Sequence, residues 1–247
     1  MKKFGLIGKT LKHSFSKNYF KEKFERENIS NCQYELFELP SIDHFQNLID
    51  THSGDLKGLN VTIPYKKEVM AFLSELDPIA KRIDAVNVIK VLDNGELKGY
   101  NSDYYGFRSS LEPWLDSTNI SALILGTGGA SNAIEKVLED LEIDFKYVSR
   151  SKKKNGYSYN ELNENPEIVN QNRLIINCTP LGTFPDVDQK PNISYDAITS
   201  NHFLYDLVYN PPTTAFMSAG LQAGAKAKNG KEMLILQAEK SWEIWNG

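Results

Sequence analysis

The fold is decided by the stretch Ser121-Ala122-Leu123-Ile124-Leu125-Gly126-Thr127-Gly128-Gly129-Ala130-Ser131. A short apolar strand, 121–125, runs into a glycine turn, and a helix is expected near Ser131–Leu141. Glycines at such a turn let the backbone approach a phosphate group, whose charge is met by the amino end of the helix. Ser131 stands where the usual G-x-G-x-x-G pattern has its third glycine. The turn indicates a dinucleotide site, and a plain strand-to-helix turn is the alternative.

The chain after the turn continues the α/β pattern. Phe145–Val148 is predicted to return as a strand, and Leu174–Ile176 and Phe203–Tyr205 are predicted as further buried strands. The last segment, Lys231–Trp245, has helical periodicity. This order predicts a parallel, doubly wound sheet.

The first hundred residues form a second α/β pattern of their own. Strands and helices are expected to alternate at Phe4–Ile7, Ser16–Glu27, Tyr34–Leu39 and Ile42–Ile49. Two further strands, Asn87–Leu92 and Glu96–Tyr100, flank Asn94-Gly95, whose residues tolerate the positive φ of a tight hairpin turn. We therefore expect an α/β protein of two domains.

The end of the second strand in the dinucleotide unit bears on the choice of cofactor. An Asp or Glu there would bind the 2′-hydroxyl of NAD, whereas a basic residue accommodates the 2′-phosphate of NADP. The chain has Ser149, Arg150 and Ser151, followed by Lys152–Lys154. Arg150 offers a planar fork to phosphate and the serines add hydroxyl donors, so NADP is predicted; a solvated basic loop is the alternative.

Three polar clusters follow strands in the first hundred residues, where α/β proteins place ligands: His13-Ser14-Phe15-Ser16, Asn60-Val61-Thr62-Ile63-Pro64-Tyr65-Lys66 and Asn101-Ser102-Asp103. Hydride transfer from an alcohol needs a group that takes the hydroxyl proton, and either Lys66 or Asp103 is a candidate. The serines are equally good helix caps, and the other residues suit turns or solvated positions.

Composition excludes several classes of function. The 247 residues are 40% hydrophobic and 24% charged, with a net charge of −4, so no chain-wide affinity for nucleic acid is expected. Cys32 and Cys178 lack the spacing of a disulfide framework or a zinc site. No run approaches the roughly 20 apolar residues of a membrane span. We expect a cytoplasmic protein without a metal.

Eight motifs together resemble those of the shikimate dehydrogenase family, and the resemblance runs nearly end to end. They are Ser14-Phe15-Ser16, Asn60-Val61-Thr62-Ile63-Pro64-Tyr65-Lys66, Ala85-Val86-Asn87, Asn101-Ser102-Asp103, Gly126-Thr127-Gly128-Gly129-Ala130, Asn177-Cys178-Thr179-Pro180-Leu181-Gly182, Asp206-Leu207-Val208-Tyr209-Asn210-Pro211 and Met233-Leu234-Ile235-Leu236-Gln237-Ala238.

The resemblance implies an N-terminal α/β substrate domain, residues 1–102 with 230–247, and a Rossmann-like doubly wound NADP-binding domain, residues 103–229, separated by a cleft. It also implies the reversible NADPH-dependent reduction of 3-dehydroshikimate to shikimate. The partner is then a small molecule rather than nucleic acid or membrane, and the protein is a monomer or homodimer.

The resemblance carries roles onto particular residues. Lys66 would be the acid/base and Asp103 its partner. The substrate would be held by Ser14 and Ser16 at its carboxylate, by Asn60, Thr62, Asn87, Asp103 and Gln237 at its hydroxyls, and by Tyr209, which would close the site. The cofactor would be held by Gly126, Gly128, Gly129 and Ala130 at the pyrophosphate, by Ser149 and Arg150 at the adenosine end, and by Thr179 and Gly230 at the nicotinamide end.

Some positions depart from the family's usual pattern. Val88 and Ser102 replace threonine, Ser149 replaces a frequent asparagine, and Tyr104 stands where a small or acidic residue is usual. Val88 removes one hydrogen-bond partner, whereas Tyr104 either narrows the pocket or turns away. These departures bear on specificity and turnover.

Three other functions are alternatives to an NADP-dependent shikimate dehydrogenase. A quinate/shikimate dehydrogenase that prefers NAD would carry an acidic residue where Arg150 stands. A non-catalytic relative that senses a metabolite would lose the proton-transfer pair, yet Lys66 and Asp103 are present. A folate-processing dehydrogenase of related layout leaves Ser14, Ser16 and Gln237 unexplained.

Overall fold

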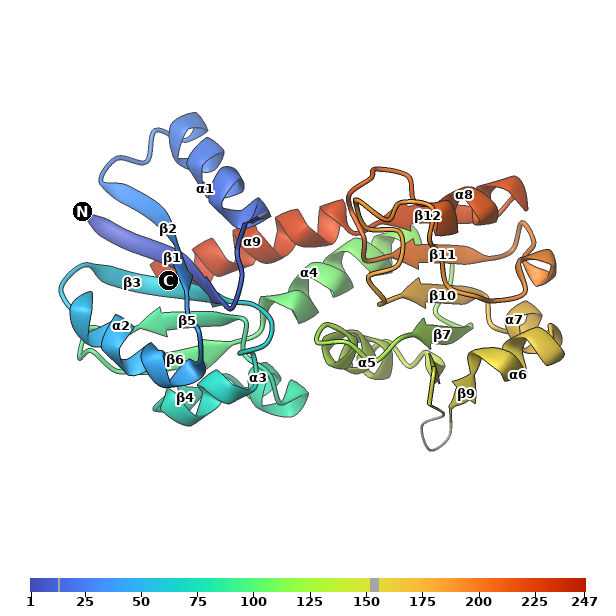
Figure 1. Cartoon of the computed structure of the whole chain (residues 1–247), viewed down its shortest axis with the longest axis horizontal. Helices are drawn as coiled ribbons and strands as arrows, with labels where there is room; N and C mark the ends of the chain where they lie inside the picture. Colours follow the sequence, from blue (N-terminus) through green and yellow to red (C-terminus); the bar gives the residue numbers. More distant parts are fainter. Residues whose placement is uncertain (13, 152–155) are drawn as a thin grey trace. The chain divides into compact units, whose positions relative to one another are not determined.

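The protein, seen in a computed structural model that describes residues 1–12, 14–151 and 156–247, forms two compact units (Figure 1). The first comprises Met1–Tyr105 with Gln237–Gly247, and the second comprises Gly106–Leu236. Both boundaries fall inside helices, α4 (Ser102–Leu111) and α9 (Lys231–Asn246). The domain limits expected from the sequence lie at the starts of the same two helices.

The first unit is built on a mixed six-stranded sheet of order β2-β1-β3-β5-β6-β4. Its strands are β1 (Lys2–Gly8), β2 (Cys32–Glu38), β3 (Leu56–Val61), β4 (Glu75–Leu76), β5 (Val88–Val91) and β6 (Leu97–Tyr100). Strands β1, β2 and β3 are parallel, whereas β5 is antiparallel to both β3 and β6. The predicted hairpin is confirmed, with Gly95 at a φ of 84° between β5 and β6.

Helices cover both faces of this sheet. Phe4 and Leu6 of β1 pack with α1 (Phe15–Arg26) and α9, while Ile7 packs with α2 (Phe45–Thr51) on the opposite face. This split follows from the alternation of side chains along a strand. The remaining helical segments are α3 (Pro78–Ile83) and the 3-10 turns Ile42–His44 and Glu68–Phe72; the first of these turns occupies the start of the helix expected at 42–49.

The second unit is an all-parallel six-stranded sheet of order β12-β11-β10-β7-β8-β9. Its strands are β7 (Ser121–Leu125), β8 (Asp144–Ser149), β9 (Tyr157–Ser158), β10 (Leu174–Asn177), β11 (Phe203–Asp206) and β12 (Lys226–Asn229). The strand order reverses between β7 and β10, which is the place where such sheets bind nucleotides. The predicted α/β class with a doubly wound, Rossmann-like unit is confirmed.

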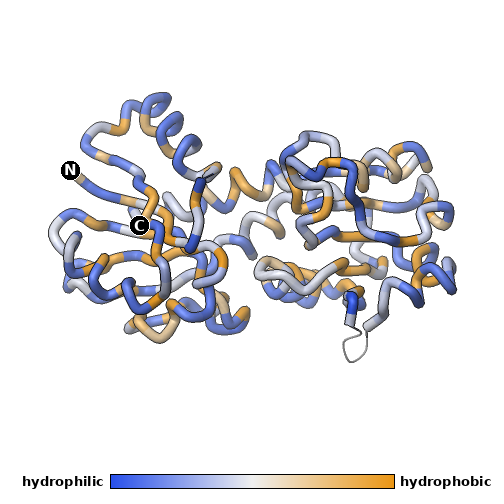
Figure 2. Tube along the Cα trace, viewed as in Figure 1, coloured by the Kyte–Doolittle hydropathy of each residue, from blue (hydrophilic) through white to orange (hydrophobic). Residues whose placement is uncertain are grey.

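The helices of this unit are α5 (Ser131–Asp140), α6 (Tyr159–Glu164), α7 (Glu167–Gln171) and α8 (Ala215–Gln222), with 3-10 turns at Glu112–Trp114 and Tyr195–Ala197. Leu123, Ile175 and Leu204 of the central strands are fully buried in a core that also contains Phe216 of α8. The outer turns of α1 in the first unit are hydrophilic (Figure 2). Among the described residues, no helix is long and apolar enough to cross a membrane.

Candidate active site

Lys66 and Asp103 form an ion pair in the first unit, with Nζ 2.5 Å from Oδ2. The backbone holds Lys66 in place, because its carbonyl accepts from Val86 N at 2.7 Å and the preceding Tyr65 donates its hydroxyl to Leu39 O at 2.6 Å. Asp103 lies in the first turn of α4, where the helix dipole favours a carboxylate. The side chains are 17% and 12% exposed, so the pair is largely shielded yet open to a small molecule.

A buried hydroxyl, Ser102 Oγ, links the amides beside this pair. Asn87 Oδ1 accepts from Ser102 N at 2.7 Å, and Asn87 Nδ2 donates to Ser102 Oγ at 3.1 Å. Ser102 Oγ also lies 3.3 Å from Gln237 Oε1 and 3.2 Å from Ser241 Oγ. Asn87 and Gln237, predicted from different ends of the chain, are thus held in one network.

Asn60 joins the same network from β3. Its Oδ1 accepts from the Tyr34 hydroxyl at 2.8 Å, and its Nδ2 donates to Ser241 Oγ at 2.9 Å and to Asn87 O at 3.3 Å. Both hydrogens of the amide are therefore used within the protein, and an acceptor lone pair on Oδ1 is what remains for a ligand. Sequence reasoning missed Tyr34 and Ser241, because neither belongs to a recognisable motif.

The serines at the start of α1 have local partners. Ser14 is the N-cap of α1 and accepts from Lys17 N at 3.4 Å, which is the capping role weighed as the alternative. Burial raises the pKa of Tyr34, and a hydrogen bond with Ser16 acts in the opposite direction. Thr62 is half-buried and donates its backbone N–H to Ile7 O at 2.9 Å.

Val88 and Tyr104, two departures from the family's usual pattern, lie in different surroundings. Val88 is fully buried in the core with Phe20 and Trp245, so it serves packing. The Tyr104 ring lies 6.0 Å from the guanidinium carbon of Arg82 in α3. A cation over an aromatic face is attracted by the ring, which steadies Tyr104 on the α3 side.

A cavity of about 580 Å³ in the second unit gathers five of the predicted cofactor residues. They are Gly126, Gly128, Ser149, Arg150 and Thr179. Its other lining residues are Thr127, Ser151, Tyr159, Cys178, Pro180 and Leu181. The volume lies within the range of ligand sites. An arginine and serines at one end and a glycine turn at the other fit a phosphorylated dinucleotide.

The glycine turn needs a glycine at its first position. Gly126 has a φ of 94°, and a Cβ there would lie 2.8 Å from Thr179 Cγ2. Because residue 126 has no side chain, the turn packs closely against Thr179 at the carboxyl end of β10, which leaves room for a ligand's phosphates.

Three predicted cofactor residues do not line the cavity. Gly129 and Ala130 lead into α5, with Ala130 at the N-cap position. Gly230 is packed so closely on Leu207 that a Cβ would lie 2.3 Å from its carbonyl oxygen. Lys152–Lys154 lie outside the described residues.

A second buried polar chain joins the ends of β10 and β11. Thr179 Oγ1 donates to Asn177 Oδ1 at 2.6 Å, and Asn177 Nδ2 donates to Asp206 Oδ1 at 2.9 Å. Asp206 also accepts from Thr214 Oγ1 at 2.6 Å and from Val208 N at 3.0 Å. Burial raises the pKa of Asp206 to about 6, against the lowering effect of these donors. These hydrogen bonds support Thr179 and the turn that carries Tyr209. Burial also raises the pKa of Tyr209.

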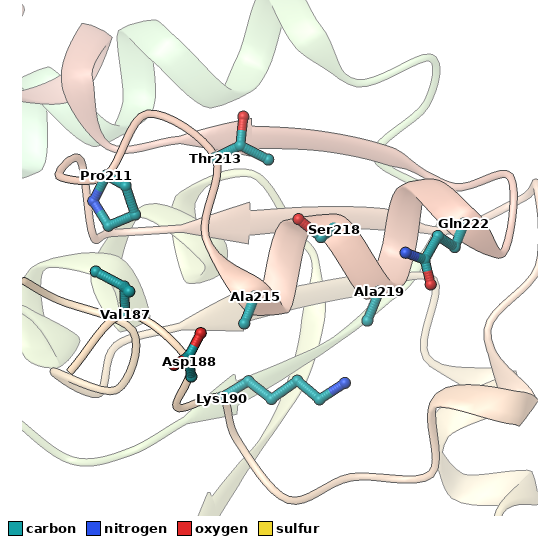
Figure 3. A pocket seen from close by; sticks show the side chains of 9 residues that line it. All are labelled: Val187, Asp188, Lys190, Pro211, Thr213, Ala215, Ser218, Ala219 and Gln222. Atoms are coloured by element: carbon teal, nitrogen blue, oxygen red, sulfur yellow. The ribbon is translucent and has the colours of Figure 1, made fainter.

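Another cavity, of about 510 Å³, lies along α8 and contains none of the predicted site residues (Figure 3). Ala215 and Ala219 face the Lys190 side chain across it, with Asp188 nearby. Within the described ranges, no group of three or more His, Cys, Asp or Glu residues is placed to hold a metal ion.

The doubly wound unit with its glycine turn and the mixed-sheet unit with its lysine–aspartate pair together define a two-domain, dinucleotide-dependent oxidoreductase. A family model, the shikimate dehydrogenase substrate binding domain, matches residues 6–89. A shikimate dehydrogenase (NADP(+)) of Methanococcus aeolicus is 36% identical over 98% of this chain and 91% of its own length. One of Clostridium beijerinckii is 39% identical over 99% and 92%.

Solved structures agree with these relatives. A chorismate mutase/shikimate 5-dehydrogenase fusion protein from Clostridium acetobutylicum matches with a TM-score of 0.89 at 37% identity, over 100% of this chain and 91% of that one. The chain belongs to the shikimate dehydrogenase family.

Proposed function

We propose that the protein catalyses the reversible NADPH-dependent reduction of 3-dehydroshikimate to shikimate, in the biosynthesis of chorismate and the aromatic amino acids. The observation that carries the proposal is the shielded Lys66–Asp103 pair, 2.5 Å apart beside a network of amides and hydroxyls. The names of the relatives, shikimate dehydrogenase (NADP(+)), support the substrate and the cofactor.

In the proposed mechanism Lys66, in its neutral amine form, accepts the proton of the shikimate hydroxyl while hydride leaves the carbon that carries this hydroxyl. Lys66 returns the proton in the reverse reaction. NADP, when bound, supplies the hydride acceptor. Asp103 accepts a hydrogen bond from Lys66 Nζ, which fixes the direction of the amine, and it has a second oxygen for a substrate hydroxyl. The proton and the hydride together account for the two-electron oxidation of the alcohol.

The surrounding polar groups suit a ring with several hydroxyls. Asn87 and Gln237 are held by Ser102, so their orientation is set before the substrate arrives. Asn60, whose donors are occupied, would accept from a substrate hydroxyl through Oδ1. Ser14, Ser16, Thr62 and Tyr209 complete the proposed set, with the two serines at the substrate carboxylate. A pre-organised set of partners lowers the entropic cost of binding.

The cofactor is proposed to lie in the cavity between the glycine turn and Arg150. Gly126, Gly128, Gly129 and Ala130 would meet the pyrophosphate, and Ser149 and Arg150 the 2′-phosphate. Thr179 and Gly230 would adjoin the nicotinamide end. Because no acidic residue ends β8, NADP is expected to bind better than NAD.

The experiment that tests this function measures nicotinamide absorbance with purified protein, pairing NADP or NAD with shikimate or quinate. We expect NADP reduction that depends on shikimate and is much slower with NAD. Equal or faster rates with NAD and quinate would favour the quinate/shikimate alternative, and binding without turnover would favour a sensor.

The role of Lys66 is tested by Lys66→Met, with its exposed neighbour as control. We expect kcat to fall by about 10²–10⁴ while the KM for shikimate changes little, because the proton acceptor is lost. Lys67→Met removes an equal charge from a side chain that is 73% exposed and paired with Asp84, and should leave turnover near that of the wild type. If Lys66→Met raised KM at unchanged kcat, Lys66 would be a binding residue only.

We further propose that the protein works in the cytoplasm as a monomer or homodimer. Both cysteines, Cys32 and Cys178, are free, which fits a reducing compartment. Light scattering after gel filtration would distinguish the two oligomeric states.

A further inference from the structure

Tyr159 contains a buried hydroxyl that the protein leaves without a hydrogen bond. It is the first residue of α6 and lines the cofactor cavity of about 580 Å³. Among side-chain nitrogen and oxygen atoms of the described residues, its Oη is the buried one that has no partner. Sequence reasoning gave Tyr159 no role.

A buried hydroxyl without a hydrogen bond destabilises the folded protein, so its presence here calls for an explanation. The local structure is otherwise well bonded. Ser158 and Glu161 form a reciprocal cap at the start of α6, and the neighbouring Tyr195 donates to Pro191 O at 2.8 Å. The lack of a partner is therefore particular to Tyr159, and the cavity that it lines is where a ligand would supply one.

The charge around the hydroxyl indicates what kind of group it would meet. Burial raises the pKa of Tyr159 to about 12, and Cys178 adds to this rise while the positive charge of Arg150 opposes it. The phenol is thus neutral and keeps its proton at pH 7. A neutral donor and an arginine bordering the same cavity suit an oxyanion with several acceptor oxygens, such as a phosphate.

We propose that Tyr159 donates a hydrogen bond to the 2′-phosphate of NADP, next to Arg150, and so helps to select NADP over NAD. This inference rests on the proposed function, because it assumes that the cavity binds NADP. The sequence analysis placed recognition of the 2′-phosphate only on residues at the end of β8. The inference adds Tyr159, which follows β9.

The test compares Tyr159→Phe with the wild type in calorimetric titrations of NADP, NAD, 2′,5′-ADP and 5′-ADP. We expect NADP and 2′,5′-ADP to bind about 10-fold more weakly to the variant, with NAD and 5′-ADP changed less than twofold, since a hydrogen bond to a charged group is lost. The ligand-free variant should melt about 2–4 °C higher, because the unsatisfied hydroxyl is gone.

Tyr195→Phe is the matched control, since it removes a neighbouring hydroxyl that already has a protein acceptor. It should lower the melting temperature and leave the ratio of NADP to NAD affinity unchanged. Equal weakening of all four ligands, or no weakening, in Tyr159→Phe would overturn the inference while wild-type binding of NADP kept the proposed function. Failure of the wild type to bind NADP would instead overturn the proposed cofactor, and the role of Tyr159 with it.

Discussion

Replacing Asp206 by asparagine should remove a pH dependence of stability from the second unit. Burial raises the pKa of Asp206 from 3.8 to about 6, so the folded state holds the proton more tightly than the unfolded chain. The stabilising effect is complete below pH 3.8 and is lost as pH rises through 6. At about 1.4 kcal/mol per pKa unit, the wild type should lose about 3 kcal/mol over this interval relative to Asp206→Asn.

The substitution is suited to this test because the introduced amide keeps an oxygen for Asn177 Nδ2 and Val208 N. Its nitrogen can donate to Thr214 Oγ1, which then acts as acceptor. The free energy of unfolding is measured with urea at pH 4 to 8 for the wild type, Asp206→Asn and Asp188→Asn. The last variant removes an exposed carboxylate from the same unit and controls for net charge. Parallel curves for wild type and Asp206→Asn would refute the reasoning.

Two further substitutions test the first unit. Ser241→Ala removes the acceptor of Asn60 Nδ2. We expect a three- to tenfold higher KM for shikimate in initial-rate assays and a loss of about 1–3 kcal/mol in the free energy of unfolding. An unchanged KM would make Ser241 purely structural. Gly58→Ala would place a Cβ 2.2 Å from the Trp245 ring and should cost about 1–3 kcal/mol in urea unfolding, whereas Gly54→Ala, with nothing within 4 Å, should not.

Much of the fold was predictable because each element has a local signal. The apolar run Ser121–Leu125 is β7 as expected, and the helix expected at Lys231–Trp245 is α9 with one residue more. The short strand β4 and the helices α6 and α7 were not predicted, since segments of two to six residues have no clear period. At 42–49 an expected helix begins with a 3-10 turn, a distinction that hydrophobic spacing does not encode.

The candidate site divides in the same way. The motifs identified Lys66 and Asp103 as candidates. The two residues are 37 positions apart in the sequence, so only the folded structure shows that their side chains are in contact at 2.5 Å. The sequence did not point to Tyr34, Ser241 or the hydrogen-bonded group around Asp206, because their hydrogen-bond partners are distant in the sequence. It did not point to Tyr159 either, because what distinguishes its hydroxyl is that it has no hydrogen-bond partner.

The sequence by itself determined the two α/β patterns, the glycine turn, the basic residue after β8 and the eight motifs that resemble the family. Each of these depends only on which residues stand close together along the chain. Tertiary structure decided which polar groups are already paired. Both N–H donors of the Asn60 amide bind acceptors within the protein, whereas the Tyr159 hydroxyl has no hydrogen-bond partner there. The reason is physical: a buried polar atom is satisfied or left free by whatever the folded chain brings within about 3 Å of it, and that proximity is a property of packing rather than of order along the chain.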